Sequence, residues 1–329
     1  METLVFVDWG KDPRKRWEAR VIREGVHARA TAPAPVLDAE RWLAELLGMR
    51  SAEHTVLVGV DFALGVPSRF AVARRPRIRA FVPFLATAPA SFFLEVRDLE
   101  RVSPATPFFR PRSKQRFALD DLARRLGARG GPWSGADGWR ALLRRCERGH
   151  PGRPRDACPV FVPRPTQDVT GATRTGWLEV VRPALAAGAK LWPFDGDLEE
   201  IARPGAIVLA ETYPAEVSSW IGLPEGKRSA EGRAPIARAL ARAIRAAGLR
   251  PAPELARDLA AGFPDRPGAL GEDRLDAVVG ALGLALARSG AVDARAPRDR
   301  EVREVEGWIL GRPSDALSTG SGRSTRRTS

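Results

Sequence analysis

The stretch LVFVD (residues 4–8) places four apolar residues directly before an acid, Asp8. Short apolar runs of this kind are typical of buried β-strands. A second such run, Thr55–Val60 (TVLVGV), is followed by Asp61, and a third, Ala206–Ala210 (AIVLA), by Glu211. Parallel and mixed α/β sheets carry functional groups at the ends of their strands. The three runs therefore predict a sheet with carboxylates gathered at one end.

The residues between the first two runs predict two more strands and a helix. Trp17–Ile22 alternates apolar and polar residues, and Val26–Ala30, after Gly25, is its expected hairpin partner. Asp38–Leu47 has helical spacing and ends at a glycine. Three strands, a helix and a returning strand are how a ribonuclease-H-like sheet begins. We therefore predict an α/β fold with a mixed five-stranded sheet flanked by helices.

The rest of the chain divides by composition. Helices are expected at Leu119–Leu126, Gly138–Arg148 and Gly176–Ala187, separated by loops rich in proline and glycine. Four segments follow from this pattern: residues 1–70 as the first part of the core, 71–204 as a large, mostly helical insertion with long loops, 205–312 as the second part of the core, and 313–329 as a disordered tail.

Two helices near the end of the chain carry charged side chains. Pro235–Ala247 is amphipathic, and its arginines Arg238, Arg242 and Arg245 form a row that could bind a phosphate backbone or simply face solvent. Asp273–Arg288 has an apolar stripe on one side. On another side it carries two acids and two glycines that permit close backbone approach, namely Asp273, Asp276, Gly280 and Gly283.

The acids together predict metal chemistry. Carboxylates crowded at one site repel one another unless cations neutralise them, so convergence of Asp8, Asp61 and Asp276 implies bound Mg²⁺ or Mn²⁺. Two such ions activate water and stabilise the leaving oxygen in phosphodiester hydrolysis. Glu211 is expected to bind an ion or orient the water, and the alternative is an ion pair with an arginine. Asp273 is either a further ligand or a helix cap.

Five motifs extend this interpretation. They are VGVDFALGVP (58–67), LWPFDG (191–196), AETYPAE (210–216), GEDRLDAVVGAL (271–282) and EGWILG (306–311). In this order they resemble the motifs of domain-of-unknown-function family 429, described as predicted nucleases with a ribonuclease-H fold. The resemblance extends nearly to residue 312. It implies that Asp8 and Asp61 are the acids of the first and fourth strands and that Asp276 is the acid of the last helix.

Composition allows several partners. The formal net charge of +13 suits a polyanion such as DNA or RNA, although arginine replacing lysine almost everywhere is also typical of a GC-rich genome. No apolar run approaches the length of a membrane-spanning helix, and the N-terminus lacks the pattern of a signal peptide. With only Cys146 and Cys158, a cytoplasmic protein without disulfides is expected.

Other functions are weighed against a nuclease. Cys146, His150 and Cys158 are close in sequence but match no common zinc motif and lack a fourth ligand. The glycine-rich segment 127–138 lacks the Gly-Lys-Ser/Thr of a P-loop, which excludes a P-loop enzyme. Two hypotheses remain beside the nuclease: a non-catalytic nucleic-acid-binding protein with the same fold, and a phosphotransferase related to sugar kinases. The second lacks the expected glycine-rich phosphate loops.

Overall fold

The computed structural model describes residues 1–112, 117–127, 135–163 and 169–314, so the predicted tail lies almost wholly outside the described residues. The strands are β1 (Glu2–Asp8), β2 (Trp17–Glu24), β3 (His27–Ala30), β4 (Ala34–Pro35), β5 (Thr55–Val60), β6 (Lys190–Trp192), β7 (Ile207–Glu211) and β8 (Arg250–Pro251). The α-helices are α1 (Ala39–Gly48), α2 (Ser68–Ala73), α3 (Phe81–Thr87), α4 (Leu119–Arg125), α5 (Val169–Gly176), α6 (Arg182–Ala186), α7 (Leu198–Ile201), α8 (Pro214–Trp220), α9 (Ala230–Ala246), α10 (Pro253–Ala261) and α11 (Gly271–Arg288). Shorter 3-10 or π-helical turns are η1 (Pro13–Lys15), η2 (Ala90–Phe93), η3 (Leu99–Arg101), η4 (Gly135–Leu142), η5 (Arg145–Glu147), η6 (Trp177–Val181) and η7 (Val302–Glu306).

The strands form one mixed sheet in the order β6-β7-β5-β1-β2-β3-β8, with β4 paired to β2. β1 is antiparallel to β2 and parallel to β5, and β5 is parallel to β7. The predicted α/β class is confirmed, and all five predicted strands are present, but the sheet has eight strands rather than five. The additional strands β4, β6 and β8 contain only two or three residues, too few for an apolar period to mark them in the sequence.

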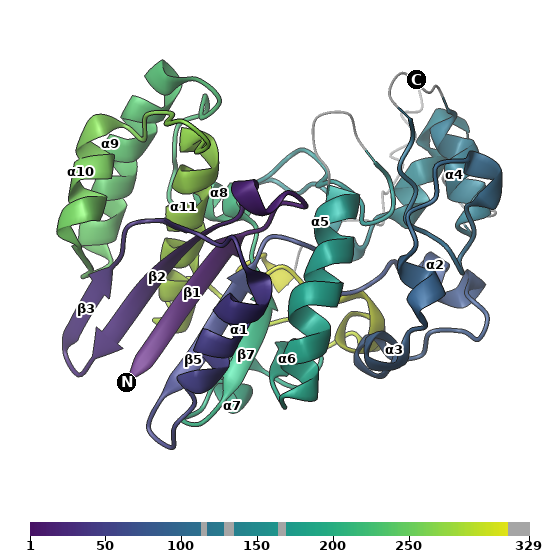
Figure 1. Ribbon diagram of the computed structural model, residues 1–329, viewed down its shortest axis with the longest axis horizontal. Coiled ribbons are helices and arrows are strands. Elements are labelled where there is room, and N and C mark those ends of the chain that lie inside the picture. Colours follow the sequence, from purple (N-terminus) through teal and green to yellow (C-terminus); the bar gives the residue numbers. More distant parts are fainter. Residues whose placement is uncertain (113–116, 128–134, 164–168, 315–329) are drawn as a thin grey trace, which may run out of the picture.

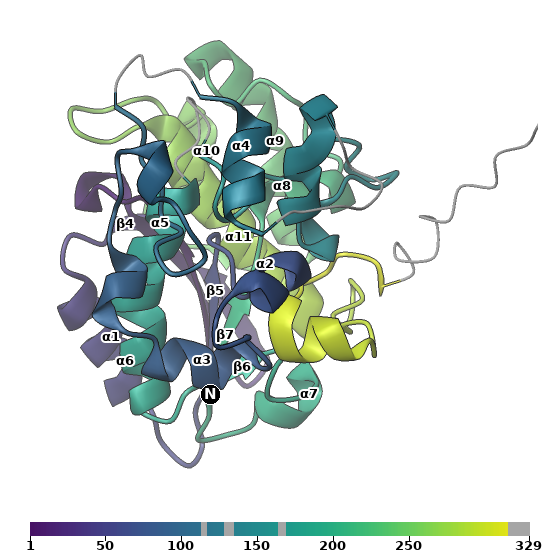
Figure 2. The ribbon, with the colours of Figure 1, turned by 90° about the vertical axis from the view of Figure 1, so that its right-hand side faces the viewer.

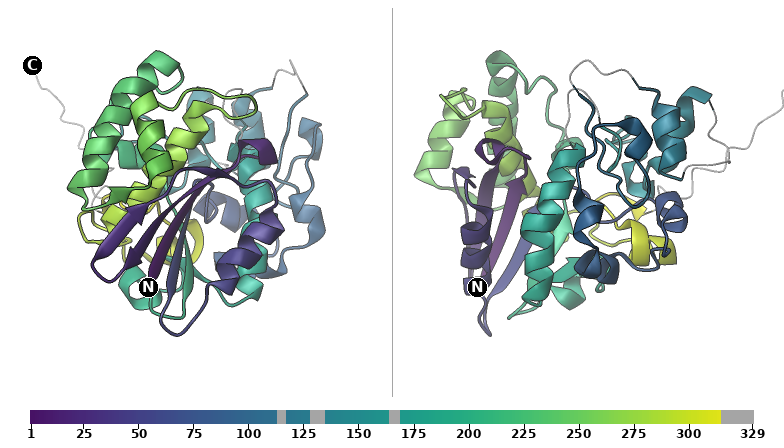
Figure 3. Two further views of the ribbon diagram at one scale, coloured as in Figure 1. Left: turned by 60° about the vertical axis from the view of Figure 1, so that its left-hand side comes forward. Right: turned by 45° about the vertical axis from the view of Figure 1, so that its right-hand side comes forward.

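The two faces of the sheet are covered by different helices, because successive side chains of a strand point to opposite faces. Leu4 and Phe6 of β1 pack into a core shared with α9, α10 and α11. Val5 and Val7 pack into a second core with α1 and much of residues 62–109 and 160–185. Figure 1 and the left view of Figure 3 show α9–α11 on one side of β1–β3 and α1 on the other.

Helix α11 packs closely against β1 and against α8. A Cβ atom added to Gly280 would lie 2.3 Å from the Phe6 ring, and one added to Gly283 would lie 2.4 Å from the Val217 side chain. The close approach expected from these glycines is therefore confirmed. It places the N-terminal turns of α11 beside the end of β1, where the acids of the sheet are found.

The helices agree with the sequence prediction in part. The helix predicted at Pro235–Ala247 begins earlier, at Ala230, because the Ser229 hydroxyl accepts a hydrogen bond from Gly232 N at 3.1 Å and caps it. The predicted helix over Gly138–Arg148 is instead formed by 3-10 turns of η4 and η5. In Figure 2 the segment that contains α2, α3 and α4 lies in front of the sheet, at one side of the core. In the described part of the chain, no helix combines the length and apolar character needed to cross a membrane.

Candidate active site

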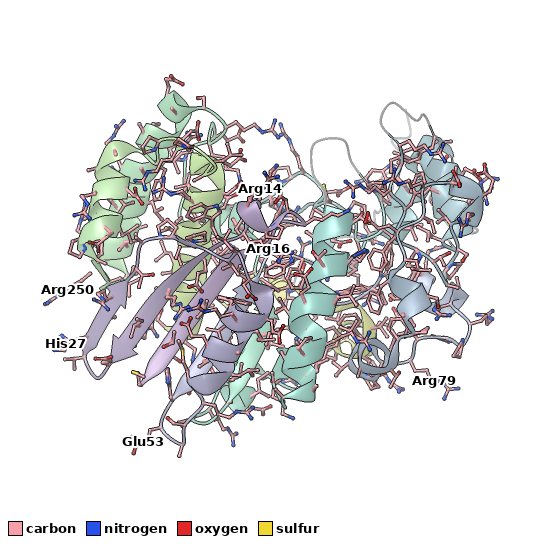
Figure 4. All side chains as sticks on the ribbon, viewed as in Figure 1. Arg14, Arg16, His27, Glu53, Arg79 and Arg250 are labelled. Atoms are coloured by element: carbon pink, nitrogen blue, oxygen red, sulfur yellow. The ribbon has the colours of Figure 1, made fainter. Side chains whose placement is uncertain are left out.

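Asp8 and Asp61 meet at the ends of two adjacent parallel strands. Asp8 ends β1, Asp61 directly follows β5, and Val7 pairs with Val60 in the register of the two strands. The Trp9 amide donates a hydrogen bond to Asp61 Oδ1 at 2.8 Å, and the two carboxyl groups are close enough to affect each other's pKa. In Figure 4, Arg14 marks this end of the sheet, and His27 and Glu53 lie at the opposite end.

Both carboxyl groups are held in an environment that disfavours their charge. Burial, followed by the charges of Asp61 and Asp276, raises the pKa of Asp8 well above its ordinary value. Burial also raises the pKa of Asp61 to about 6, although its hydrogen bonds oppose the shift. Among the described residues, neither acid forms a salt bridge with a lysine or arginine. A cation bound between the two groups would relieve the cost of burying their charge.

Helix α11 brings two more acids to the same place. Burial raises the pKa of Asp273 to about 6, with Asp276 and Glu272 adding to the shift. Asp273 is not the helix cap, because the N-cap position belongs to Leu270, which forms no side-chain cap. Asp276 differs from the others, since its Oδ2 atom accepts a hydrogen bond from Lys227 Nζ. Glu272 Oε1 lies 3.4 Å from the same ammonium group.

All five predicted acids, including Glu211, line one open cavity of about 840 Å³. The cavity is bounded by the ends of β1, β5 and β7, by η1, and by the first turns of α11. Basic side chains share its wall with the carboxylates. These are Lys11, Arg14, Lys15, Arg110, Arg144 and Lys227.

Glu211 is at the cavity but is fully engaged in an ion pair. Arg144 Nη2 lies 2.6 Å from Glu211 Oε1, and Arg144 Nη1 lies 2.7 Å from Glu211 Oε2. The Leu64 amide donates a further hydrogen bond to Oε2 at 2.7 Å. Both side chains are buried. The structure therefore favours the arginine pair over the expected role as metal ligand, since no oxygen of Glu211 is left without a strong donor.

The donor set at Asp8 and Asp61 fits a hard divalent cation. Mg²⁺ is commonly held by one or two carboxylates, with water and substrate phosphate completing its shell. In the described part of the chain, however, no group of three or more His, Cys, Asp and Glu side chains is arranged so that it could hold a metal ion. Asp276 is bound to Lys227 instead. The carboxyl chemistry thus suits one ion at the strand ends, without a second preformed group of ligands on α11.

The cysteine and histidine cluster does not form a metal centre. His150 Nε2 lies 2.5 Å from Glu216 Oε1, and Arg153 Nε donates to the second oxygen of Glu216 at 2.7 Å. Cys146 is buried, and that burial raises the pKa of its thiol. These contacts give His150 and Glu216 a structural role between η5 and α8.

The other predicted binding residues lie elsewhere. Arg238, Arg242 and Arg245 are exposed on α9, and none of them lines the cavity. Trp177 and Trp192 are fully buried, as expected of core residues.

Sequence reasoning missed Lys227 and Arg144, the two cations that contact the acids. Lysine stands only at positions 11, 15, 114, 190 and 227 in a chain otherwise rich in arginine, and three of the four lysines that the structure describes line the cavity. The rarity of lysine in this chain could have identified Lys227 as a candidate site residue. No comparable signal marks Arg144, which is one arginine among many.

Comparison of the chain with family models, with curated proteins and with solved structures found no match. The chemistry of the site therefore rests on its own geometry.

Proposed function

We propose that the protein is a metal-dependent nuclease that hydrolyses phosphodiester bonds of DNA or RNA, with Mg²⁺ or Mn²⁺ held by Asp8 and Asp61. One observation carries the proposal: at the ends of two adjacent parallel strands, two carboxyl groups line the same cavity, and among the described residues neither has a cationic partner. They face a cavity of about 840 Å³ that is large enough for part of a nucleic acid chain. Desolvated carboxylates of this kind are common at functional sites.

We further propose that the core is ribonuclease-H-like, as the resemblance to domain-of-unknown-function family 429 implies. The strand order β3-β2-β1-β5-β7 supports it, with three antiparallel strands followed by two parallel ones. Helix α1 stands between β4 and β5 in the chain, as the resemblance leads one to expect. The acids that the resemblance assigns to the site are Asp8 on β1, Asp61 after β5 and Asp276 on α11.

The side chains divide the work of hydrolysis among them. Asp8 and Asp61 would hold a divalent ion, which would supply the charge that activates water and stabilises the phosphoryl oxygens. In the reaction the water oxygen forms a bond to phosphorus, the ester P–O bond breaks, and the leaving oxygen takes a proton from solvent. We assign the proton taken from water to Asp273, because it lines the same cavity, has no ion-pair partner among the described residues, and has a carboxyl pKa that burial raises to about 6.

The charge of the cavity wall supports a phosphate-bearing substrate. Lys15 is exposed at the rim and, among the described residues, has no ion-pair partner. Lys11 is paired with Glu95 at 2.7 Å, and Arg14 with Asp12 at 2.7 Å. A lysine without a carboxylate partner is available to attract a phosphate, and the net charge of +13 acts in the same direction.

The test is a cleavage assay of the full chain on single-stranded, duplex and branched DNA and RNA. We expect cleavage with Mg²⁺ or Mn²⁺ and none with EDTA, and we expect Asp8→Asn to reduce cleavage roughly a thousandfold, equivalent to about 4 kcal/mol of lost transition-state stabilisation. Asp12→Asn is the matched control, since it removes another acid from the cavity wall that is already paired with Arg14.

The outcomes separate the hypotheses. Equal cleavage by the wild type and Asp8→Asn would exclude the proposed mechanism. Salt-sensitive binding without cleavage, unchanged by Asp8→Asn, would identify the alternative, a non-catalytic nucleic-acid-binding protein.

A further inference from the structure

Lys227 is the cation that contacts the acids of α11 at the cavity. Its ammonium group is bonded to Asp276 Oδ2 and lies 3.4 Å from Glu272 Oε1, so it bridges two acids one helical turn apart. The Lys227 side chain remains 41% exposed, whereas that of Asp276 is 15% exposed. The ammonium group therefore lies between a buried carboxylate and the open cavity.

The backbone of Lys227 is held in place by a buried arginine. Arg233 Nη1 donates to the Lys227 carbonyl at 3.1 Å, and Arg233 Nη2 pairs with Asp265 at 2.8 Å. The same Asp265 oxygen accepts a hydrogen bond from the Gly271 amide at 2.7 Å, at the first residue of α11. The loop that bears Lys227 and the start of the helix that bears Asp276 thus share one anchor.

Gly271 is required for this anchor. A Cβ atom there would lie 1.9 Å from the Phe263 carbonyl oxygen and 2.7 Å from Arg233 Nε. The loop that bears Lys227 is therefore anchored to the start of α11 by the buried Arg233, in addition to the ion pair between Lys227 and Asp276.

The charge of Lys227 interacts with the carboxylates of Asp276, Glu272 and Asp8. Burial alone would lower the pKa of Lys227, but the carboxylates of Asp276, Glu272 and Asp8 raise it, so the side chain stays charged. A fixed positive charge at Asp276 repels any further cation at that carboxylate. In a two-ion site, this is the region where the second ion would be held.

We propose that Lys227 takes the place of a second metal ion, so that the site binds a single divalent cation at Asp8 and Asp61 and presents the Lys227 ammonium group to a phosphate oxygen of the substrate. This inference rests on the proposed function, and it makes Lys227 a catalytic residue. The ammonium group donates hydrogen bonds to a non-bridging phosphate oxygen and offsets the charge that develops there as the P–O bond breaks.

The test counts bound Mn²⁺ without any turnover. Mn²⁺ is titrated into the metal-free full chain, and free Mn²⁺ is followed by electron paramagnetic resonance. The wild type is expected to bind a single ion, and Lys227→Gln is expected to bind a second ion at least tenfold more tightly than the wild type does. Arg228→Gln is the matched control, because Arg228 is exposed, carries the same charge and is the next residue in the loop. It should bind as the wild type does.

Two further variants keep the test decisive. Lys227→Met is a second neutral replacement in case Lys227→Gln does not fold, as judged by thermal melting, and Lys227→Arg should keep a single ion. Two tightly bound ions in the wild type, or a single ion in both neutral variants, would overturn the role of Lys227 and leave the proposed function standing. No bound Mn²⁺ in any of the proteins would overturn the proposed metal-dependent function itself.

Discussion

Three neighbouring parallel strands each end in an acid, yet the acids have different surroundings. Asp8 and Asp61 lie side by side and line the cavity without a described cation, whereas Glu211 is held by the two terminal nitrogens of a buried guanidinium group. The backbone position differs by one residue, because β7 pairs with β5 so that Glu211 lies opposite Val60, whereas Asp61 follows Val60. The second difference is Arg144, which contacts Glu211 from another segment of the chain.

An acid at a strand end therefore does not have a fixed role, because its exact register and its partner differ from strand to strand. A carboxylate with an arginine at 2.6 Å and 2.7 Å is neutralised and fixed, so it stabilises the fold. A pair of carboxyl groups without a cation is costly for the fold and is available for a ligand. Substitutions in the Asp8–Asp61 pair and in the Glu211–Arg144 ion pair should therefore have different effects.

The largest expected effect is on catalysis. Asp61→Asn should lower kcat/KM roughly a thousandfold, since the site loses one of its two ion-binding carboxylates. Glu211→Gln should keep kcat/KM of the folded fraction within about tenfold, because Glu211 does not contact the ion in the proposed mechanism. Cleavage rates normalised to the folded fraction check this. Equal losses in the two variants would mean that Glu211 belongs to the reacting site.

The next largest expected effect is on the free energy of unfolding. Arg144→Met leaves both Glu211 and Glu147 without their cation and should lower the free energy of unfolding by about 3–5 kcal/mol. Urea denaturation measures it, and Arg148→Met, an exposed neighbour, should change stability by no more than about 0.5 kcal/mol. Adding Glu211→Gln to Arg144→Met should recover part of the loss. If Arg144→Met were as stable as Arg148→Met, the buried ion pair between Arg144 and Glu211 would not hold this region together.

The sequence predicted one side of this comparison better than the other. The five long strands and the acids at their ends follow from apolar runs, which depend only on local pattern. The pairing of Glu211 with Arg144 spans 67 residues and links a strand to a 3-10 turn without apolar period, so local pattern carries no trace of it. Lys227 was missed for a related reason, since it lies in a loop whose position depends on the buried Arg233.

A smaller effect concerns the dependence of stability on pH. The pKa of Asp61 is raised to about 6 in the folded chain, so its contribution favours folding at pH 4 and is lost as the pH rises through about 6. In metal-free buffer at pH 8, Asp61→Asn should therefore be more stable than the wild type by about 2–3 kcal/mol, and the difference should vanish near pH 4.

Unfolding free energies in EDTA, measured from pH 4 to pH 8, check this expectation, and Asp12→Asn provides a control of opposite sign. The pKa of Asp12 is lowered to about 2 by its hydrogen bonds with Arg14, so its carboxylate stabilises the fold at neutral pH and the variant should be the less stable protein. Saturating Mg²⁺ should remove the advantage of Asp61→Asn. A wild type that is the more stable protein in EDTA at pH 8 would show that the two strand-end acids are not in conflict.

The smallest expected effect is on the salt dependence of nucleic-acid binding, and it compares two sets of basic side chains. Lys15 lies at the rim of the cavity without a described ion-pair partner, whereas Arg238, Arg242 and Arg245 are exposed on α9 and do not line it. Each phosphate contact contributes about 0.9 to the slope of log affinity against log salt concentration, so Lys15→Gln should lower that slope by about 1. Replacing all three α9 arginines by glutamine should leave it nearly unchanged. Fluorescence anisotropy with labelled DNA and RNA at several salt concentrations measures both. A slope lowered by about 3 in the triple variant would instead mean that nucleic acid runs along α9, because neutralising three phosphate contacts is the only change of that size available to these arginines.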